Sequence, residues 1–269
     1  MKIAAIQLRS GVDIAANIDA AAALIRTAAQ HGARFIATPE MSNILQRSPK
    51  RLHAAIQPMD SAPEMAAFSA LAKELAIDLL IGSMAFKASE GRAVNRSVLF
   101  GHDGETRAYY DKIHLFDVTI SRTETWKESN VYDRGEQAVT ADITGAKLGL
   151  SICYDVRFPK LYQTYAQAGA QIIAAPAAFT VPTGQAHWET LLRARAIETG
   201  SFIIAPAQGG AHEDGRTTWG RSMIIGPWGD VRAALDHDRP DICMAEIDLA
   251  DVETARAKIP AWNYAPDFT

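Results

Sequence analysis

Several features that would assign the chain to a class are missing from it. The 269 residues include only two cysteines, which is too few for a disulfide framework, and neither a CxxC nor an HExxH pattern occurs. No apolar run reaches the roughly 18 residues of a membrane span, and "MKIAAIQLRS" alternates like a strand and is not a signal peptide. We therefore expect a reduced, cytoplasmic protein with no metal, no cofactor and no membrane partner.

The chain also lacks a large excess of charge of either sign. The formal net charge is −4, with acidic and basic residues mixed along the chain and no basic block. Nucleic acid is therefore not expected as a partner. No Pro/Gly/Ser-rich linker and no low-complexity tract interrupts the chain, so we expect one domain over residues 1–269.

Strand-like and helix-like segments alternate along the chain, and hairpins are mixed among them. This order predicts an α/β layered fold with mixed sheets. The predicted helices cover residues 17–33, 62–78, 159–170 and 186–200. The predicted strands and hairpins cover residues 3–8, 34–41, 79–86, 95–116, 146–155, 171–179, 202–209, 221–235 and 241–249.

Cys153 lies in "LGLSICYDVRFPKLY", at the end of an apolar strand and shortly before Pro159, which suits the first turn of a helix. Alternation places Gly149 and Ser151 on its face, so the backbone there can approach another group closely. A strand-to-helix turn exposes a side chain and offers a backbone N–H to an oxyanion. The alternative is a packed cysteine, because free cysteine is among the most buried residue types. These residues alone leave both interpretations open.

Two other polar residues stand at the ends of apolar stretches. Glu40 closes "RFIATPE", and by itself this position favours a solvated loop carboxylate over a site residue. Lys112 is expected inside the strand "AYYDKIHLF", where an exposed lysine is common at sheet edges.

Together the stretches "TPE", "DKIHLFD" and "CYDVRFPKLY" resemble, in this order, the glutamate, lysine and cysteine motifs of the nitrilase superfamily of carbon–nitrogen hydrolases. The resemblance runs from "KIAAIQL" to "KIPAW". Three further stretches are similar to the branch of deaminated-glutathione amidases and omega-amidases, namely "ESN" at 128–130, "AHWETLLRARAIETG" at 186–200 and "RSMIIGPWGDV" at 221–231. Arg221, where that branch often has histidine, and the tail "NYAPDFT" depart from it.

The resemblance implies a four-layer α-β-β-α sandwich and an amidase that releases ammonia through a thioester. It implies that Cys153 is the nucleophile, that Glu40 is the general base, and that Lys112 holds the oxyanion and favours the thiolate. The backbone N–H of Tyr154 would share the oxyanion. Glu128 would orient the substrate or Lys112, with a solvated loop carboxylate as the alternative.

The substrate implied by the resemblance is a small amide that carries a carboxylate. Arg157 would bind that carboxylate with its guanidinium, the alternative being a structural salt bridge such as one with Asp155. Phe179 and Thr180 are expected to line the pocket. His187 and Trp188 are expected at a helix start and in packing, and Glu189 and Arg193 as a helix-surface pair; Cys243 is expected to be a buried strand residue.

Three alternatives remain at this point: an N-carbamoyl amino acid amidohydrolase, a non-catalytic scaffold with the same fold, and a redox-sensing cysteine. The resemblance also implies a homodimer or a higher homo-oligomer, with a contact made by the helix after Cys153 and the helix at 187–199.

Overall fold

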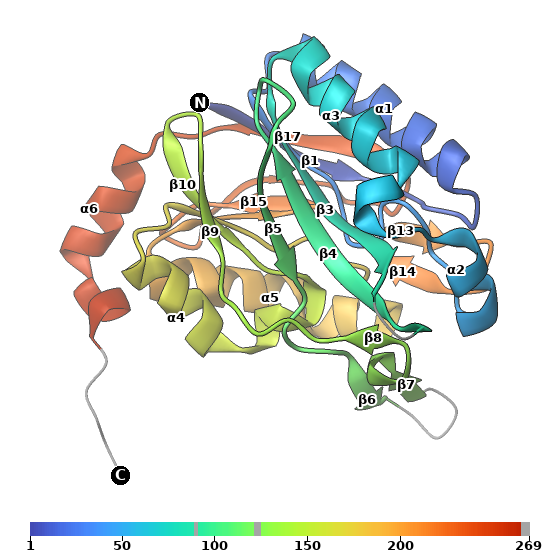
Figure 1. Cartoon of the computed structure of the whole chain (residues 1–269). Helices are drawn as coiled ribbons and strands as arrows, with labels where there is room; N and C mark the ends of the chain where they lie inside the picture. The colour runs from blue at the N-terminus through green and yellow to red at the C-terminus, as the bar shows by residue number, and fades with distance from the viewer. Residues whose placement is uncertain (89–90, 121–124, 265–269) are drawn as a thin grey trace.

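The computed structural model describes residues 1–88, 91–120 and 125–264. Two large sheets lie face to face between layers of helices (Figure 1). The first sheet has the order β17, β1, β2, β3, β4 and β5, with β8 paired to β4. Its strands are β1 Lys2–Gln7, β2 Phe35–Ala37, β3 Asp78–Lys87, β4 Ala93–Phe100, β5 Thr106–Asp111, β8 Tyr132–Asp133 and β17 Asp241–Glu246.

The second sheet has six strands in the order β16, β15, β12, β11, β10 and β9. They are β9 Thr140–Ile143, β10 Ala146–Leu150, β11 Ile172–Ala174, β12 Phe202–Ala205, β15 Met223–Ile225 and β16 Val231–Ala234. Two small hairpins stand apart, formed by β6 Asp117–Thr119 with β7 Thr125–Lys127 and by β13 Gly209–Ala211 with β14 Thr217–Trp219. Both large sheets mix parallel and antiparallel neighbours, as expected.

Helices cover the outer faces of both sheets. In Figure 1, α1 and α3 lie on one side and α4 and α5 on the other. The helices are α1 Ile14–Gln30, α2 Pro49–Ala55, α3 Pro63–Leu75, α4 Pro159–Gln167, α5 Val181–Thr199 and α6 Ala250–Lys258, and the short 3-10 turns are η1 Met59–Ser61, η3 Glu128–Asn130, η4 Cys153–Arg157 and η5 Pro260–Asn263. The expected α-β-β-α sandwich is confirmed.

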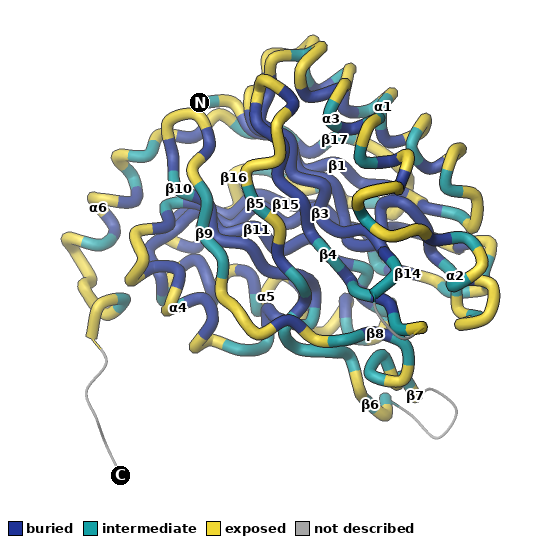
Figure 2. The backbone as a smooth tube through the Cα atoms, viewed as in Figure 1, coloured by how far each residue is buried: buried dark blue, intermediate teal, exposed yellow. Residues whose placement is uncertain are grey.

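Strand alternation divides the core into two layers. Ile6 of β1 joins the cluster that includes Phe68 of α3, between sheet and helices. Ile3 of the same strand joins Leu148 and Ile172 of the other sheet, in the layer between the two sheets. Central strands buried on both faces read as continuous apolar runs, which is why the sequence identifies them. Figure 2 shows this buried centre in dark blue. No helix in the described part of the chain is long and apolar enough to cross a membrane.

Several expected boundaries are wrong. The strand expected to run through Lys112 ends at Asp111. The helix expected at 186–200 begins five residues earlier, because Pro182 fits its first turn and Gly184 leaves room for the ring of Trp219. The stretch around Glu128 is not a bare loop, since it holds β6, β7, η3 and β8. Residues 265–269 of the divergent tail lie outside the described residues, and the expectation of one domain stays a prediction.

Candidate active site

Cys153 stands where the chain leaves β10 and turns toward α4. Its φ is 51°, a left-handed conformation that is uncommon for a residue with a side chain. Such a backbone costs about 1–3 kcal/mol and persists only where the surroundings enforce it, most often at functional sites. Its own N–H donates to the carbonyl of Pro176 at 2.8 Å. The close approach expected beside Gly149 is made by the ring of Tyr165, because a Cβ on Gly149 would lie 2.8 Å from Tyr165 Cγ.

The buried carboxylate of Asp155 holds this turn in place. It accepts hydrogen bonds from the N–H of Ile152 at 2.8 Å and from the hydroxyl of Tyr110 at 2.7 Å. It also accepts from the N–H of His114 at 3.0 Å and lies 2.7 Å from His114 Nδ1. Asp155 thereby ties the Cys153 turn to the segment that follows β5. The sequence analysis did not assign it this role, although it lies inside the cysteine motif.

Glu40 follows β2 and is buried, with 4% of its surface exposed, which excludes a solvated loop carboxylate. Its Oε1 accepts from Lys112 Nζ at 2.7 Å and its Oε2 from the N–H of Ala178 at 3.0 Å. Burial alone would raise the pKa of this carboxyl. The charge of Lys112, together with hydrogen bonds from Lys112, Cys153 and Asn95, outweighs burial and lowers the pKa below its ordinary value. Glu40 is therefore ionised at neutral pH.

Lys112 is the cation of the site and lies directly after β5 with 2% of its surface exposed, which excludes the alternative of an exposed strand lysine. Its Nζ is 2.7 Å from Glu40 Oε1 and 2.9 Å from Glu128 Oε2. Burial opposes its charge, but the fields of Glu128 and Glu40 raise its pKa well above the ordinary value. Lys112 therefore keeps its proton and links the two carboxylates.

Glu128 belongs to the same cluster. Its side chain is 12% exposed, and its Oε2 accepts from the N–H of Phe116 at 2.6 Å. The site thus contains two carboxylates around one ammonium group, and the alternative of a solvated loop residue is excluded.

Asn95 of β4 connects the two carboxylates and was missed by the sequence analysis. Its Nδ2 donates to Glu40 Oε1 at 2.9 Å and to Glu128 Oε1 at 3.2 Å. Its Oδ1 is buried and has no hydrogen-bond partner within the described residues. The available signal was strand alternation, which places Asn95 on the same buried face as Ala93 and Ser97.

The thiol of Cys153 lies beside the Glu40 carboxylate and the N–H of Ala178. Burial first, and then the negative charge of Glu40, raise its pKa well above the ordinary value, while Lys112 and the Ala178 N–H act in the opposite direction. Lys112 favours the thiolate, as expected, but burial and Glu40 together outweigh it. The site rests as a neutral thiol next to an ionised carboxylate.

Tyr154 and Arg157 flank Cys153. Among the described residues the N–H of Tyr154 donates to no protein acceptor, so it is free for an oxyanion. Arg157 Cζ lies 5.8 Å from the ring centroid of Tyr154 and 5.3 Å from that of Phe179. The salt bridge considered between Arg157 and Asp155 is not formed, because Asp155 is occupied inside the turn.

Phe179, Thr180 and Trp188 lie at or near the N-terminal end of α5. Phe179 is buried beside the site, at 4.9 Å between ring centroids from Trp188, whose Nε1 donates to the carbonyl of Arg221 at 2.8 Å. Thr180 precedes α5, and its Oγ1 lies 2.8 Å from that of Thr183, so it is engaged in the helix start. Trp188 packs as expected.

His187 does not open the helix. It lies in the second turn of α5, with Nδ1 3.3 Å from Arg157 Nη1. Glu189 and Arg193 form the expected i,i+4 pair, at 3.3 Å. Cys243 is a buried residue of β17, as expected.

Comparison with known proteins agrees with this geometry. The sequence profile of the family "Carbon-nitrogen hydrolase" matches residues 2–257. A deaminated glutathione amidase of Synechocystis is 36% identical over 97% of this chain and 96% of its own length, and that of Homo sapiens is 36% identical over 99% of this chain and 83% of its own.

Solved structures give the same result. The crystal structure of the Caenorhabditis elegans NitFhit protein aligns with a TM-score of 0.91 at 37% identity, covering 98% of this chain and 64% of that one. Saccharomyces cerevisiae Nit3 aligns at 0.87 with 28% identity, covering 97% of this chain and 94% of that one. The chain spans 60% of the C. elegans fusion protein in the sequence comparison. The chain therefore belongs to the carbon–nitrogen hydrolase family and is a hydrolase of carbon–nitrogen bonds other than peptide bonds.

Proposed function

We propose that this enzyme is a cysteine amidase that cleaves a small, carboxylate-bearing amide through a thioester on Cys153. One observation carries the proposal: the Glu40 carboxylate is bound to Lys112 at 2.7 Å and lies against the thiol of Cys153 inside a buried site. A neutral thiol beside an ionised carboxylate is a nucleophile with its base already in place.

The reaction we propose begins with proton transfer from Cys153 Sγ to Glu40. The sulfur attacks the amide carbonyl carbon, and the resulting oxyanion is received by the N–H of Tyr154 and by Lys112 Nζ. When the tetrahedral intermediate collapses, Glu40 returns the proton to the leaving nitrogen, and the C–N bond breaks. Glu40 then takes a proton from water, which attacks the thioester and releases the carboxylic acid and the thiol.

The charges of the cluster favour this sequence. Proton transfer from Cys153 to Glu40 moves one negative charge from oxygen to sulfur and leaves the total unchanged, so no net charge has to be created in the buried site. Lys112 remains a cation throughout, because its pKa is raised by both carboxylates. Glu128 keeps Lys112 in place when Glu40 is protonated, through the contacts of 3.1 and 2.9 Å.

Arg157 is proposed to bind a carboxylate of the substrate. Among the residues described here it pairs with no carboxylate, and its guanidinium lies over the rings of Tyr154 and Phe179 at the site. Deaminated glutathione, for which several relatives are named, bears a carboxylate at each end, and we extend this class of substrate to the present chain. The same arginine suits an N-carbamoyl amino acid, which would release carbon dioxide as well as ammonia.

The test uses the two cysteines as a matched pair. We expect Cys153→Ala to reduce amide hydrolysis by at least about 10³-fold with an unchanged fold, because no other group can form the thioester. Cys243→Ala should keep activity within about twofold, since Cys243 is 2% exposed and burial raises its pKa to about 12. Mass spectrometry of the wild-type enzyme mixed with a panel of amides should show the acyl adduct on the peptide that contains Cys153. Full activity of Cys153→Ala, or an adduct elsewhere, would refute the mechanism.

A measurement of products separates the two substrate classes. Carbon dioxide and ammonia in equal amounts would replace the amidase by the carbamoyl hydrolase, whereas carboxylic acid with ammonia or amine alone supports the amidase. Activity of either kind argues against the non-catalytic scaffold.

We also propose a cytoplasmic homodimer that associates through α4 and α5. Both cysteines are free thiols, which supports a reducing compartment. Ile197 on α5 is 53% exposed, which supports an apolar contact on that helix. Light scattering should give the mass of two chains, and Ile197→Glu should give one; a wild-type protein of one chain's mass at micromolar concentration contradicts the proposal.

A further inference from the structure

Two arginine side chains gather on the ring of Trp126 in β7. Arg47 Cζ lies 5.1 Å from the ring centroid and Arg216 Cζ lies 5.7 Å from it. Both distances are within the range in which a cation is attracted to the face of an indole. The indole ring therefore holds the guanidinium of Arg47 close to that of Arg216.

The segments that carry Arg47 and Trp126 also carry two residues of the candidate site, Glu40 and Glu128. Arg47 lies at the end of the segment that begins with Glu40, and Trp126 precedes Glu128 by two residues. These two segments therefore supply Glu40 and Glu128 to the buried cluster, and Arg47 and Trp126 to the region around it.

Arg216 comes from a distant part of the sequence. It lies in the turn between β13 and β14, and the N–H of Trp219 in β14 donates to the carbonyl of Phe179 at 2.9 Å. Its charge also reaches the interior: burial and Glu128 raise the pKa of Tyr132, and Arg216 opposes them. Arg216 and the carboxylates of Glu128 and Glu40 therefore act on the same phenol, that of Tyr132.

A wall of aromatic rings connects the two arginines to the nucleophile. Trp126 lies 6.4 Å from Phe116, and Phe116 lies 5.2 Å from Tyr154, the residue after Cys153 (centroid distances). The two steps limit the distance from Trp126 to Tyr154 to about 12 Å, roughly the length of three extended residues. Arg157 lies over Tyr154 at the opposite end of this wall.

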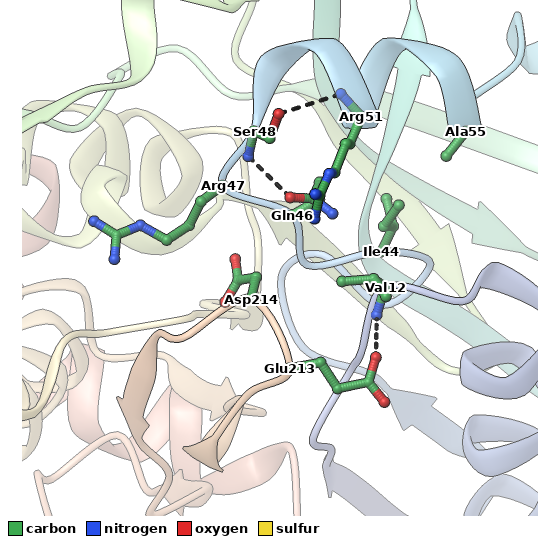
Figure 3. A pocket seen from close by; sticks show the side chains of 9 residues that line it. All are labelled: Val12, Ile44, Gln46, Arg47, Ser48, Arg51, Ala55, Glu213 and Asp214. Atoms are coloured by element: carbon green, nitrogen blue, oxygen red, sulfur yellow. Dashed lines mark hydrogen bonds between the residues drawn. The ribbon is translucent and has the colours of Figure 1, made fainter.

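The two arginines differ in how far their charge is already satisfied. Arg216 Nε is 2.7 Å from Asp214 Oδ2, and the Asp214 side chain is 1% exposed, so this pair is fixed. Arg47 is exposed and forms no ion pair with any residue that the structure describes. It lines a pocket of about 460 Å³ together with Arg51, Glu213 and Asp214, and Figure 3 shows its guanidinium extended away from Arg51 and Glu213.

We propose that Arg47, supported by Trp126 and Arg216, binds a second carboxylate of the substrate. The inference rests on the proposed function and specifies it: the substrate is a substituted amide with one carboxylate near Arg157 and another near Arg47, on either side of the bond that Cys153 attacks. Hydrolysis of such an amide consumes one water and releases a carboxylate and an amine that carries its own carboxylate. A guanidinium suits this task because it can bind a carboxylate with two parallel hydrogen bonds.

The kinetic test compares deaminated glutathione with the same compound in which the glycine carboxylate is replaced by a carboxamide. We expect Arg47→Gln to raise KM for the acid by about tenfold to a hundredfold, with kcat within about twofold, because one charge-assisted contact is lost. The carboxamide should have a similarly raised KM with the wild-type enzyme and should be unaffected by the substitution. The matched control is Lys50→Gln, which removes the same charge from an exposed residue of α2. It should leave KM for both compounds within about twofold.

A binding measurement separates this inference from the proposed function. Calorimetry on Cys153→Ala should show the acid bound at least about tenfold more tightly than the carboxamide, and Arg47→Gln in that background should abolish the difference. If the wild-type enzyme hydrolyses neither compound but this preference is found, the reaction is wrong and the carboxylate site stands. Equal affinities of Cys153→Ala for the acid and the carboxamide, or a preference that survives Arg47→Gln, would overturn the inference.

Discussion

Replacement of Asn95 by alanine tests how the carboxylate pair is held. The substitution deletes the bonds from Nδ2 to Glu40 at 2.9 Å and to Glu128 at 3.2 Å. Each hydrogen bond to a charged group contributes about 1.5–3 kcal/mol, and removal of the unpartnered Oδ1 returns about 1–3 kcal/mol. We therefore expect the free energy of unfolding to fall by about 2–3 kcal/mol, measured by urea denaturation.

The same substitution should change the pH dependence of hydrolysis. Asn95 is one of the groups that lower the pKa of Glu40, so its loss raises that pKa. Because Glu40 must be ionised to accept the thiol proton, the acid limb of kcat/KM should move to higher pH. The control is Ser97→Ala on the same face of β4, whose Oγ donates to the Ile81 carbonyl at 3.2 Å. It should cost about 1 kcal/mol and leave the acid limb in place. An unchanged acid limb in Asn95→Ala would refute the reasoning.

Three further outcomes follow from the same geometry. Asp155→Asn replaces a carboxylate that accepts several hydrogen bonds by an amide, whose nitrogen can only donate. The free energy of unfolding, measured in urea, should therefore fall by about 3 kcal/mol; a loss below about 1 kcal/mol contradicts the proposed role of Asp155 in holding the Cys153 turn. Gly149→Ala places a methyl group 2.8 Å from Tyr165 Cγ and should lower stability by about 1–3 kcal/mol in the same assay, with an unchanged value as the contrary result. The ionised form of Glu40 stabilises the fold above the ordinary carboxyl pKa, and this contribution should disappear as pH falls through the lowered pKa; acid titration of Glu40→Gln should lack that step.

Local patterns in the sequence were sufficient for the fold class and for naming the groups that we propose to react. Apolar runs identify the buried strands because both faces of a central strand meet other side chains. The order of Glu40, Lys112 and Cys153 within their motifs indicated the family. Element boundaries were less certain. Lys112 lies beyond the end of its strand, and α5 begins at Val181, because Pro182 fits its first turn and Gly184 leaves room for the ring of Trp219.

The sequence by itself indicated which groups we propose to react, because residue type and local motif are properties of short stretches. Only the tertiary structure decided how those groups meet and which protonation state each of them has. Glu40 and Lys112 are 72 residues apart in the chain, and their contact at 2.7 Å is made across one edge of a sheet, at which β2 and β5 both end with β3 and β4 between them. Burial and electrostatic field depend on every neighbouring segment, so the neutral thiol of Cys153 and the exposed position of Arg47 over Trp126 appear only in the folded chain.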